Sequence, residues 1–298
     1  MKIIIDQPQI IWELGTRENQ EDSVFPACGE STSEDKIFIL CDGMGGHERG
    51  EVASSTVCSV LSSYFHDNWD GIGFTDGLLF DALSRAMDEL NKNVTDKLRN
   101  PGTTLTLLVF HKGGAFVAHI GDSRIYHIRP SEHRLLYKSR DHSQVYDLLA
   151  AGDISLEEMK TYSKKNVITR AMIAGADRVP KPSIAHVADI RPGDYFYLCS
   201  DGMLEEMSDS ELVDIFSKDI SDDAKRDLLV ESTKENNDNH SAYIIHIKDV
   251  IPEDDDIFLK NDEAESPTNA LLLENEAKNQ PVNKKTGFFT KMIKKIFN

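Results

Sequence analysis

The sequence predicts an α+β fold in which most strands pair in the antiparallel sense. Strand-like apolar runs and helical patterns mix along residues 1–250 without the regular alternation of strand and helix that marks a parallel sheet. The runs 105–110 and 115–120 are separated only by His111-Lys112-Gly113-Gly114, a hairpin signal that joins antiparallel neighbours. We therefore expect residues 1–250 to form one domain.

The spacing of apolar residues places the individual elements in chain order. A period near 3.6 predicts helices, the first of which begins at Gly50-Glu51-Val52-Ala53. The predicted helices cover residues 50–65, 77–98, 144–151, 209–217 and 222–234. Short apolar runs bounded by turn residues predict buried strands. These strands cover residues 37–41, 103–110, 115–120, 124–128, 195–200 and 242–247.

Carboxylates mark the ends of four predicted strands. Two apolar runs end in Asp-Gly, a third ends in Gly-Asp, and an Asp-Asn pair precedes a fourth; the aspartates are Asp42, Asp201, Asp122 and Asp238. An isolated Asp-Gly usually forms only a turn, but its repetition at strand ends predicts one shared site at a sheet edge. Clustered carboxylates are tolerated when a hard divalent cation such as magnesium or manganese neutralises them. The pattern therefore predicts a metal-dependent active site.

Two neighbouring segments support this interpretation. Gly43 follows Asp42, and a residue without a Cβ lets its backbone carbonyl approach a metal ion. A glycine-rich phosphate loop is the rival interpretation, but neither GxxxxGK[ST] nor GxGxxG occurs there. Arg17 lies four residues before the acidic pair Glu21-Asp22. A planar guanidinium beside a pair of metal ions is suited to hold a phosphate dianion.

The composition of the chain limits which classes of partner it can bind and where in the cell it is expected. The 298 residues carry a formal net charge of −18, from 51 acidic and 33 basic side chains, which argues against a nucleic-acid partner. The first apolar stretch, Ile3-Ile4-Ile5, is too short for a signal peptide, and no run approaches the roughly 20 residues of a membrane span. A cytoplasmic location is expected. Four cysteines without CxxC spacing favour reduced thiols over a cysteine zinc site or disulfides.

Seven short blocks follow one another between about residues 12 and 248. They are Arg17/Asn19/Glu21-Asp22, Asp42-Gly43-Met44-Gly45-Gly46-His47, Gly102-Thr103-Thr104, Gly121-Asp122-Ser123-Arg124, Asp141-His142-Ser143, Ser200-Asp201-Gly202 and Asp238-Asn239. Together they resemble the metal-dependent (PPM-type, type 2C) serine/threonine protein phosphatases in their compact bacterial form. Each block alone is weak, but their common order and spacing make the resemblance specific.

The resemblance implies a fold, a reaction and cofactors. The fold would be a β-sandwich of two antiparallel sheets flanked by helices on both sides, with a metal centre in a cleft at one end. The reaction would be hydrolysis of phosphoserine and phosphothreonine in proteins by a bridging hydroxide between two Mn²⁺ or Mg²⁺ ions, with a third ion possible. Phosphorylated proteins, and a cognate kinase that makes them, would be the partners, and the chain would act as a monomer.

The same resemblance implies a role for each matched residue. Asp42 would bridge the two ions, the Gly43 carbonyl and Glu21 would serve one of them, and Asp201 and Asp238 the other. Asp22 would orient the attacking water, Arg17 would bind the substrate phosphate, and Asp122 would hold a third, weaker ion. Positioning and charge neutralisation would then supply most of the rate enhancement.

Some residues depart from the family pattern, and other functions stay open. Met44 stands where many members have a histidine that protonates the leaving oxygen, so that proton would come from metal-bound water or an unidentified group. His47 and His142 are expected to form structural hydrogen bonds. The segment 150–178 falls where the family carries a mobile flap. A phosphoprotein-binding pseudophosphatase and a small-metabolite phosphatase are the alternative functions.

Two segments of different composition follow residue 250. Residues 251–283 are expected to form a flexible acidic linker, because residues 251–280 carry nine acidic side chains and two lysines. Residues 284–298 hold five lysines and no acidic side chain, and on a helical wheel Lys291, Lys294 and Lys295 occupy the half opposite to the apolar residues. Such a basic amphipathic helix is typical of contact with an anionic membrane, here its inner face, or with a partner protein. Docking on the chain's own acidic domain is the alternative.

Overall fold

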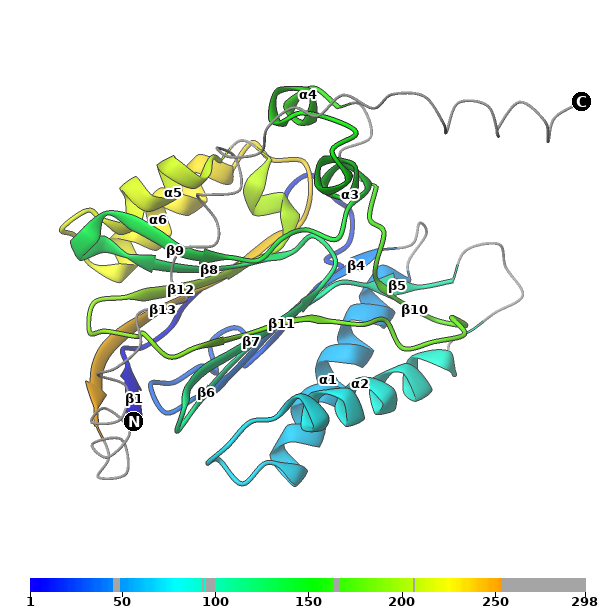
Figure 1. Ribbon diagram of the computed structural model, residues 1–298, viewed down its shortest axis with the longest axis horizontal. Coiled ribbons are helices and arrows are strands. Elements are labelled where there is room, and N and C mark those ends of the chain that lie inside the picture. The colour runs from blue at the N-terminus through cyan, green and yellow to red at the C-terminus, as the bar shows by residue number, and fades with distance from the viewer. Residues whose placement is uncertain (45–48, 93, 95–99, 163–166, 206, 253–298) are drawn as a thin grey trace, which may run out of the picture. The chain divides into compact units, whose positions relative to one another are not determined.

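The computed structural model describes residues 1–44, 49–92, 94, 100–162, 167–205 and 207–252. Over these residues two antiparallel β-sheets stack face to face, and helices cover the outer face of each sheet, as Figure 1 shows. This arrangement confirms the predicted α+β class and the helix-flanked β-sandwich that the family resemblance implies. No helix in the described part of the chain is long and apolar enough to cross a membrane.

All the paired strands in both sheets run antiparallel. The first sheet has the order β1-β13-β12-β8-β9, and β2 also pairs with β13. Its strands are β1 (Lys2–Ile5), β2 (Gln9–Glu13), β8 (Arg124–Arg129), β9 (Arg134–Lys138), β12 (Tyr195–Cys199) and β13 (His240–Ile251). The second sheet has the order β10-β5-β4-β6-β7-β11, and β3 also pairs with β4. Its strands are β3 (Asp22–Phe25), β4 (Ile37–Met44), β5 (Gly102–Thr103), β6 (Leu105–His111), β7 (Gly114–Ile120), β10 (Met172–Ile173) and β11 (Ser183–Val187).

Two pairs of helices form the outer layers. On the second sheet, α1 (Gly50–Asn68) contacts β3, β4 and β5 and packs against α2 (Asp76–Asn91). On the first sheet, α6 (Asp222–Thr233) contacts β2 and β13 and packs against α5 (Asp209–Phe216). The shorter α3 (Gln144–Ala151) and α4 (Leu156–Lys160) lie between β9 and β10 in the chain. A serine or threonine hydroxyl caps four of these helices by accepting a backbone N–H, at Thr75, Ser155, Ser208 and Ser221.

Buried apolar side chains fill the three interfaces between the four layers. Two edge-to-face aromatic pairs join the sheets at the centre. Phe38 of β4 lies 5.3 Å from Tyr243 of β13, and Phe110 of β6 lies 5.4 Å from Phe196 of β12, measured between ring centroids. Because both faces of each sheet are covered, the central strands are apolar on both sides. This is why they were recognisable in the sequence as continuous apolar runs.

The observed elements differ from the predicted ones in four main respects. The five-residue helix α4 was not predicted. Helix α2 ends at Asn91 and not at residue 98, because the Lys92 N–H bonds back to the carbonyls of Glu89 and Leu90 and residue 94 is not helical. The predicted strand 103–110 is two strands, β5 and β6, with a break at Thr104. Strands β1, β2, β3, β9, β10 and β11 were missed, since each has five residues or fewer and carries little periodic signal.

Several predicted features lie outside the described residues. They are Gly45, Gly46 and His47 of the glycine block, residues 163–166 of the predicted flap, and the acidic linker and basic helix beyond residue 252. The cysteines are all described and all are free thiols. Cys41, Cys58 and Cys199 are buried, as expected of thiols that pack as small apolar groups, whereas Cys28 is exposed.

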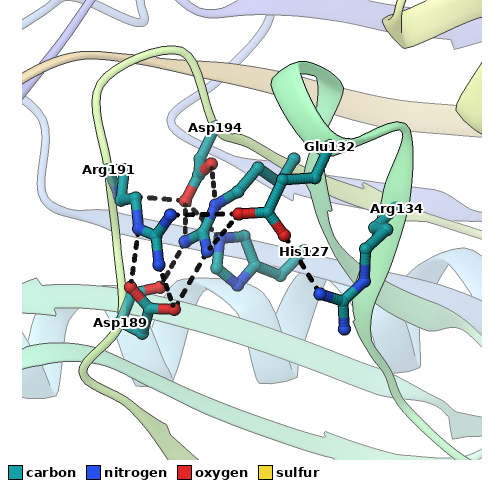
Figure 2. Close-up of polar contacts among 7 residues, drawn as sticks. His127, Glu132, Arg134, Asp189, Arg191 and Asp194 are labelled. Carbon is teal, nitrogen blue, oxygen red and sulfur yellow. Dashed lines mark hydrogen bonds and ion pairs between the residues drawn. The ribbon is translucent and has the colours of Figure 1, made fainter.

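A charged cluster joins β8 and β12 at the end of the first sheet opposite to Asp201. Arg129 ends β8 and is only 2% exposed, and Asp194 directly precedes β12. The Asp194 carboxylate accepts hydrogen bonds from Arg129 Nε and His127 Nε2, both at 2.8 Å, and Asp189 adds a second carboxylate 2.9 Å from Arg129. Burial raises the pKa of Asp194, but the hydrogen bonds from His127 and Arg129 outweigh it and lower this pKa to about 2. Figure 2 shows the cluster together with Glu132, Arg134 and Arg191.

We predict that Asp194→Asn lowers the free energy of unfolding by about 3 kcal/mol at pH 7, because it leaves the buried Arg129 charge with too little compensation. A carboxyl group whose pKa is lower in the folded than in the unfolded chain stabilises the fold at any pH above its unfolded pKa. For Asp194 this contribution is lost as the pH falls from about 4 to about 2. The variant should therefore lose less stability than the wild type over this range. Urea unfolding at each pH measures both effects.

Asp214→Asn is the matched control, because Asp214 contacts His133 at 3.1 Å in an exposed pair. An exposed pair of this kind contributes about 0–1 kcal/mol. Equal unfolding free energies for Asp194→Asn and Asp214→Asn would show that the buried cluster does not stabilise the fold.

Candidate active site

The predicted site residues meet at one end of the sandwich, because the strands that carry them come from both sheets. In the second sheet, Asp22 begins β3 and pairs in register with Asp42 of β4. In the first sheet, Asp201 follows β12 and Asp238 precedes β13, and β12 pairs with β13 so that Cys199 lies opposite Ala242. The stacked sheets thus bring carboxylates that are far apart in sequence to one edge, as the sequence analysis predicted.

Asp42 lies at the electrostatic centre of this edge. Burial raises the pKa of Asp42 well above its usual range, and the charges of Asp22, Asp201, Asp122 and Asp238 raise it further. The Asp42 backbone N–H donates to Thr104 Oγ1 at 3.0 Å, which fixes the strand that presents it. Like charges at this spacing repel, so the group of carboxylates is stable only if protons or cations compensate it.

Asp22 is buried next to Asp42, with 3% of its surface exposed. The Ser200 hydroxyl donates to its Oδ2 at 2.9 Å and also accepts the Ser241 N–H at 3.0 Å. Burial raises the pKa of Asp22 to about 7, although the serine hydrogen bonds oppose the rise. Asp22 is therefore held rigidly between the two sheets, and Ser200, which the sequence analysis placed in a matched block without a role, is the side chain that holds it.

Glycines bring Glu21 close to the backbone that follows Asp42. The Gly43 N–H donates to the Glu21 carbonyl at 3.1 Å. A Cβ added to Gly43 would lie 2.4 Å from the Gly50 carbonyl oxygen, and one added to Gly50 would lie 2.7 Å from the Glu21 carboxylate. Burial raises the pKa of Glu21. Only glycine at both positions lets the Glu21 carboxylate approach the start of α1 and the Gly43 backbone.

Asp238 is held by two partners that the local sequence pattern does not reveal. Arg17, which was predicted to bind phosphate, contacts Asp238 Oδ2 at 2.6 Å and is half exposed. Glu205 accepts the N–H groups of Asn237 and Asp238, each at 3.1 Å. Glu205 follows Asp201 by four residues, but its turn has no periodic pattern by which the sequence could have identified it. The Arg17 guanidinium therefore lies at the site, next to a predicted metal ligand.

Asp122 lies at the margin of the group. It is 8% exposed, and its Oδ1 has no hydrogen-bond partner among the residues that the structure describes. Burial raises its pKa to about 7, and the charges of Asp201 and Asp141 add to the rise. The charge of Arg124 opposes this rise, but its guanidinium binds both carboxylate oxygens of Asp141, at 2.7 and 2.8 Å. A buried carboxylate oxygen without a donor is suited to a cation.

His142 makes structural contacts near Asp122. Its Nδ1 accepts the Gly121 N–H at 3.1 Å, and its Nε2 lies 2.8 Å from Ser183 Oγ. Its ring stacks on His119, with centroids 4.5 Å apart. Burial and, to a smaller extent, the charges of nearby basic groups lower the pKa of His142 to about 3, so the ring is neutral near pH 7. These contacts agree with the hydrogen-bonding role that we expected for it.

The whole set of donors fits hard divalent cations. It consists of anionic oxygens, together with the Gly43 carbonyl, and the raised carboxyl pKa values show that positive charge is favourable there. The Asp201 and Asp42 side chains share a hydrogen bond, and Arg17 engages Asp238. Among the described residues, three ligand atoms come within 4.8 Å of one another only at Asp6, Asp222 and His246, outside this site.

Comparison with known sequences gives a consistent result. Residues 16–228 match the family described as protein phosphatase 2C, a range that contains all the candidate residues except Asp238. Protein phosphatase PhpP of Streptococcus pneumoniae serotype 2 (strain D39) is 36% identical over 196 residues, which are 65% of this chain and 78% of that protein. The serine/threonine phosphatase stp of Listeria welshimeri is 32% identical over 213 residues, 67% of this chain and 79% of that protein.

Solved structures share the fold over most of the described domain. The serine/threonine phosphatase Stp1 from Staphylococcus aureus superposes with a TM-score of 0.69 at 26% identity, covering 83% of this chain and 98% of that chain. The catalytic domain of the serine threonine protein phosphatase PstP, solved in complex with two manganese ions, gives a TM-score of 0.67 at 28% identity. It covers 83% of this chain and 100% of that chain.

Proposed function

We infer the function from one premise: this chain belongs to the protein phosphatase 2C family. It is a metal-dependent protein serine/threonine phosphatase of the PPM type, and its substrates are phosphoproteins. Manganese or magnesium ions are its cofactors, as in the related PstP domain with its two manganese ions. The observation that carries the assignment within this structure is the group of buried carboxylates with raised pKa values at one edge of the sandwich.

We propose the following ligands for the ions. Asp42 would lie between two ions, because the other carboxylates surround it. Glu21 and the Gly43 carbonyl would serve one ion, since the glycine contacts bring these two groups together. Asp201 and Asp238 would serve the other, and the unpaired oxygen of Asp122 supports a third ion beside them.

The chain's own residues would position the substrate and the water around these ions. When bound, the ions acidify a water molecule and offset the charge of the phosphate. The Asp22 carboxylate, fixed by the Ser200 hydroxyl, would accept a hydrogen bond from the attacking water and so set its direction. The half-exposed Arg17 guanidinium would leave Asp238 and bind two phosphate oxygens. The seryl or threonyl oxygen then leaves with a proton from the surrounding water.

We also propose a counterpart enzyme and an oligomeric state. A serine/threonine kinase that makes the phosphoproteins would be the counterpart of this enzyme. The chain would act as a monomer. The pseudophosphatase alternative loses support because each carboxylate proposed as a ligand is present and lies at the site.

Hydrolysis of phosphopeptides tests the proposed function. Matched peptides that carry phosphoserine, phosphothreonine or phosphotyrosine are incubated with manganese, with magnesium and with a chelator. We expect turnover of the first two peptides only, and only with metal. Equal turnover of a small sugar phosphate would favour the metabolite alternative, and binding of the phosphopeptide without turnover would favour a pseudophosphatase.

We predict that Asp201→Asn abolishes turnover in saturating manganese while the metal-free protein melts at the same temperature or higher. The variant loses a proposed ligand, but it also removes a buried carboxylate whose pKa is raised by burial and by Asp238, so repulsion falls. Asp227→Asn, at an exposed pair with Arg226, is the matched control and should behave as the wild type. Near wild-type turnover of Asp201→Asn would remove Asp201 from the metal site.

We predict that Arg17→Ala raises the KM for phosphopeptides more than it lowers kcat, because the guanidinium would bind phosphate in the ground and transition states alike. The loss of a charge-assisted pair corresponds to about 1.5–3 kcal/mol, roughly a 10- to 150-fold change in KM. Arg134→Ala is the control, since Arg134 is also exposed but lies in the cluster of Figure 2. An unchanged KM for Arg17→Ala would exclude a phosphate-binding role.

We predict that the full-length protein co-sediments with vesicles of anionic lipid in a salt-sensitive way, whereas a chain truncated after Gln280 does not. The lysines and the apolar residues of 284–298 would contact the headgroups and the acyl boundary, respectively. Vesicles of neutral lipid are the control. Equal sedimentation of both chains would exclude membrane binding, and a changed rate upon truncation without lipid would indicate docking on the enzyme itself.

A further inference from the structure

Three ligand-bearing side chains converge on one point far from the carboxylate edge. Asp6 follows β1, Asp222 begins α6, and His246 lies within β13. One ligand atom from each of them lies within 4.8 Å of the other two. His246 comes six residues after the first residue of β13, about 20 Å along the strand at a rise of about 3.3 Å per residue. The convergence is therefore separate from the proposed catalytic centre.

The distances among the three groups are short enough for one cation to contact all of them. His246 Nδ1 lies 3.1 Å from Asp6 Oδ2 and 3.1 Å from Asp222 Oδ2. In a tetrahedral site with metal–ligand distances of about 2.0–2.2 Å, the ligand atoms lie about 3.3–3.6 Å from one another. A single proton on Nδ1 can point at only one of these carboxylates, whereas a cation would contact all three groups at once.

Each of the three side chains also contacts a further residue that fixes its orientation. The Tyr195 hydroxyl donates to the second oxygen of Asp222 at 2.6 Å, and Lys248 Nζ lies 3.6 Å from the second oxygen of Asp6. The His246 ring stacks on Tyr195, its registered partner in β12, with centroids 4.3 Å apart and planes inclined by 2°. Metal sites in proteins are characterised by such outer contacts, which orient the ligands.

The backbone brings Asp6 to this point. Strand β1 changes its register against β13 between Ile4 and Ile5, so that Ile5 pairs with Ile247. The Asp6 N–H then donates to the His246 carbonyl at 3.0 Å. An irregularity in the edge strand thus places the Asp6 carboxylate beside the imidazole.

We propose that Asp6, Asp222 and His246 bind a zinc-class divalent cation. One imidazole nitrogen with two carboxylate oxygens is a ligand set for Zn²⁺ or Co²⁺, whereas Mg²⁺ and Ca²⁺ prefer oxygen alone. A fourth position would be open to water, because Asp222 and His246 also line a surface groove of about 490 Å³. The ammonium groups of Lys248 and Lys225 lie close by and offset part of the negative charge, so moderate affinity is expected.

The ion would connect the N-terminal strand and helix α6 to strand β13. Its role would be to fasten an outer layer to the first sheet, and it would take no part in the hydrolysis. The proposal does not depend on the proposed function, because none of its three residues belongs to the carboxylate edge.

The test uses the full-length protein in excess Mg²⁺, so that Mg²⁺ is available to the proposed catalytic site, whose ligands are all oxygen atoms. Co²⁺ is then added as a visible probe for Zn²⁺, and zinc binding is counted by equilibrium dialysis. We expect the wild type to show the intense visible absorption of four-coordinate Co²⁺ and His246→Gln to lack it. His246→Gln should bind one Zn²⁺ fewer per chain, or bind it at least tenfold more weakly.

Two further variants make the result specific. His133→Gln is the matched control, since His133 is an exposed histidine that contacts the single carboxylate of Asp214 at 3.1 Å, and it should behave as the wild type. Asp6→Asn removes a second proposed ligand at a half-buried position and should match His246→Gln, with a metal-free melting temperature that shows it is folded. The same zinc stoichiometry and affinity in wild type, His246→Gln and Asp6→Asn would overturn the proposal and leave an ion pair only.

Discussion

The mutual repulsion of carboxylates at one edge of the sandwich is the constraint on which the rest of the site depends. Burial raises the pKa of Asp42, and the charges of four other aspartates raise it further. Such an arrangement costs free energy unless the surrounding fold enforces it. The enforcement comes from the interior, where Phe38 and Phe110 of the second sheet pack against Tyr243 and Phe196 of the first. The apolar core therefore holds together, at its end, charges that would otherwise separate.

Close packing of backbone segments also holds the carboxylates together. A Cβ on Gly202 would lie 2.1 Å from the Asn239 carbonyl oxygen, and one on Gly15 would lie 2.2 Å from that of Asp238. Gly15 also has a φ of +62°, a conformation that glycine adopts without strain. The loops after β2 and β12 thus approach the segment before β13 more closely than any other residue allows. Glycine in the matched blocks serves the approach of loops to one another as well as an open path to a metal ion.

The sequence revealed the parts of the site that lie on continuous strands, and it missed the parts that depend on contacts between chain segments. Asp42 and Asp201 follow long buried runs, so their common edge was predictable from period and position alone. The contact of Arg17 with Asp238 joins residues 221 positions apart, and nothing local signals it. Glu205 was missed for the same reason. The sandwich itself was predictable only through the family resemblance, because the apolar runs indicated strands without showing how many sheets they form.

Charged side chains are paired at one end of the first sheet, whereas carboxylates repel one another at the other end. The first arrangement stabilises the fold, and the second suits a functional site. At the end near β8 and β12, the buried Arg129 is matched by the carboxylates of Asp194 and Asp189, so its charge is satisfied within the fold. At the other end, Arg17 forms an ion pair with Asp238. The pKa values of Asp22, Asp42, Asp122 and Asp201 are nevertheless raised there. A protein that used both ends for stability would place a cation beside each acid, as it does at Arg129. The buried aspartates with raised pKa values therefore gather at the edge that we propose accepts ions and a phosphate, and the apolar core supplies the packing that keeps them there.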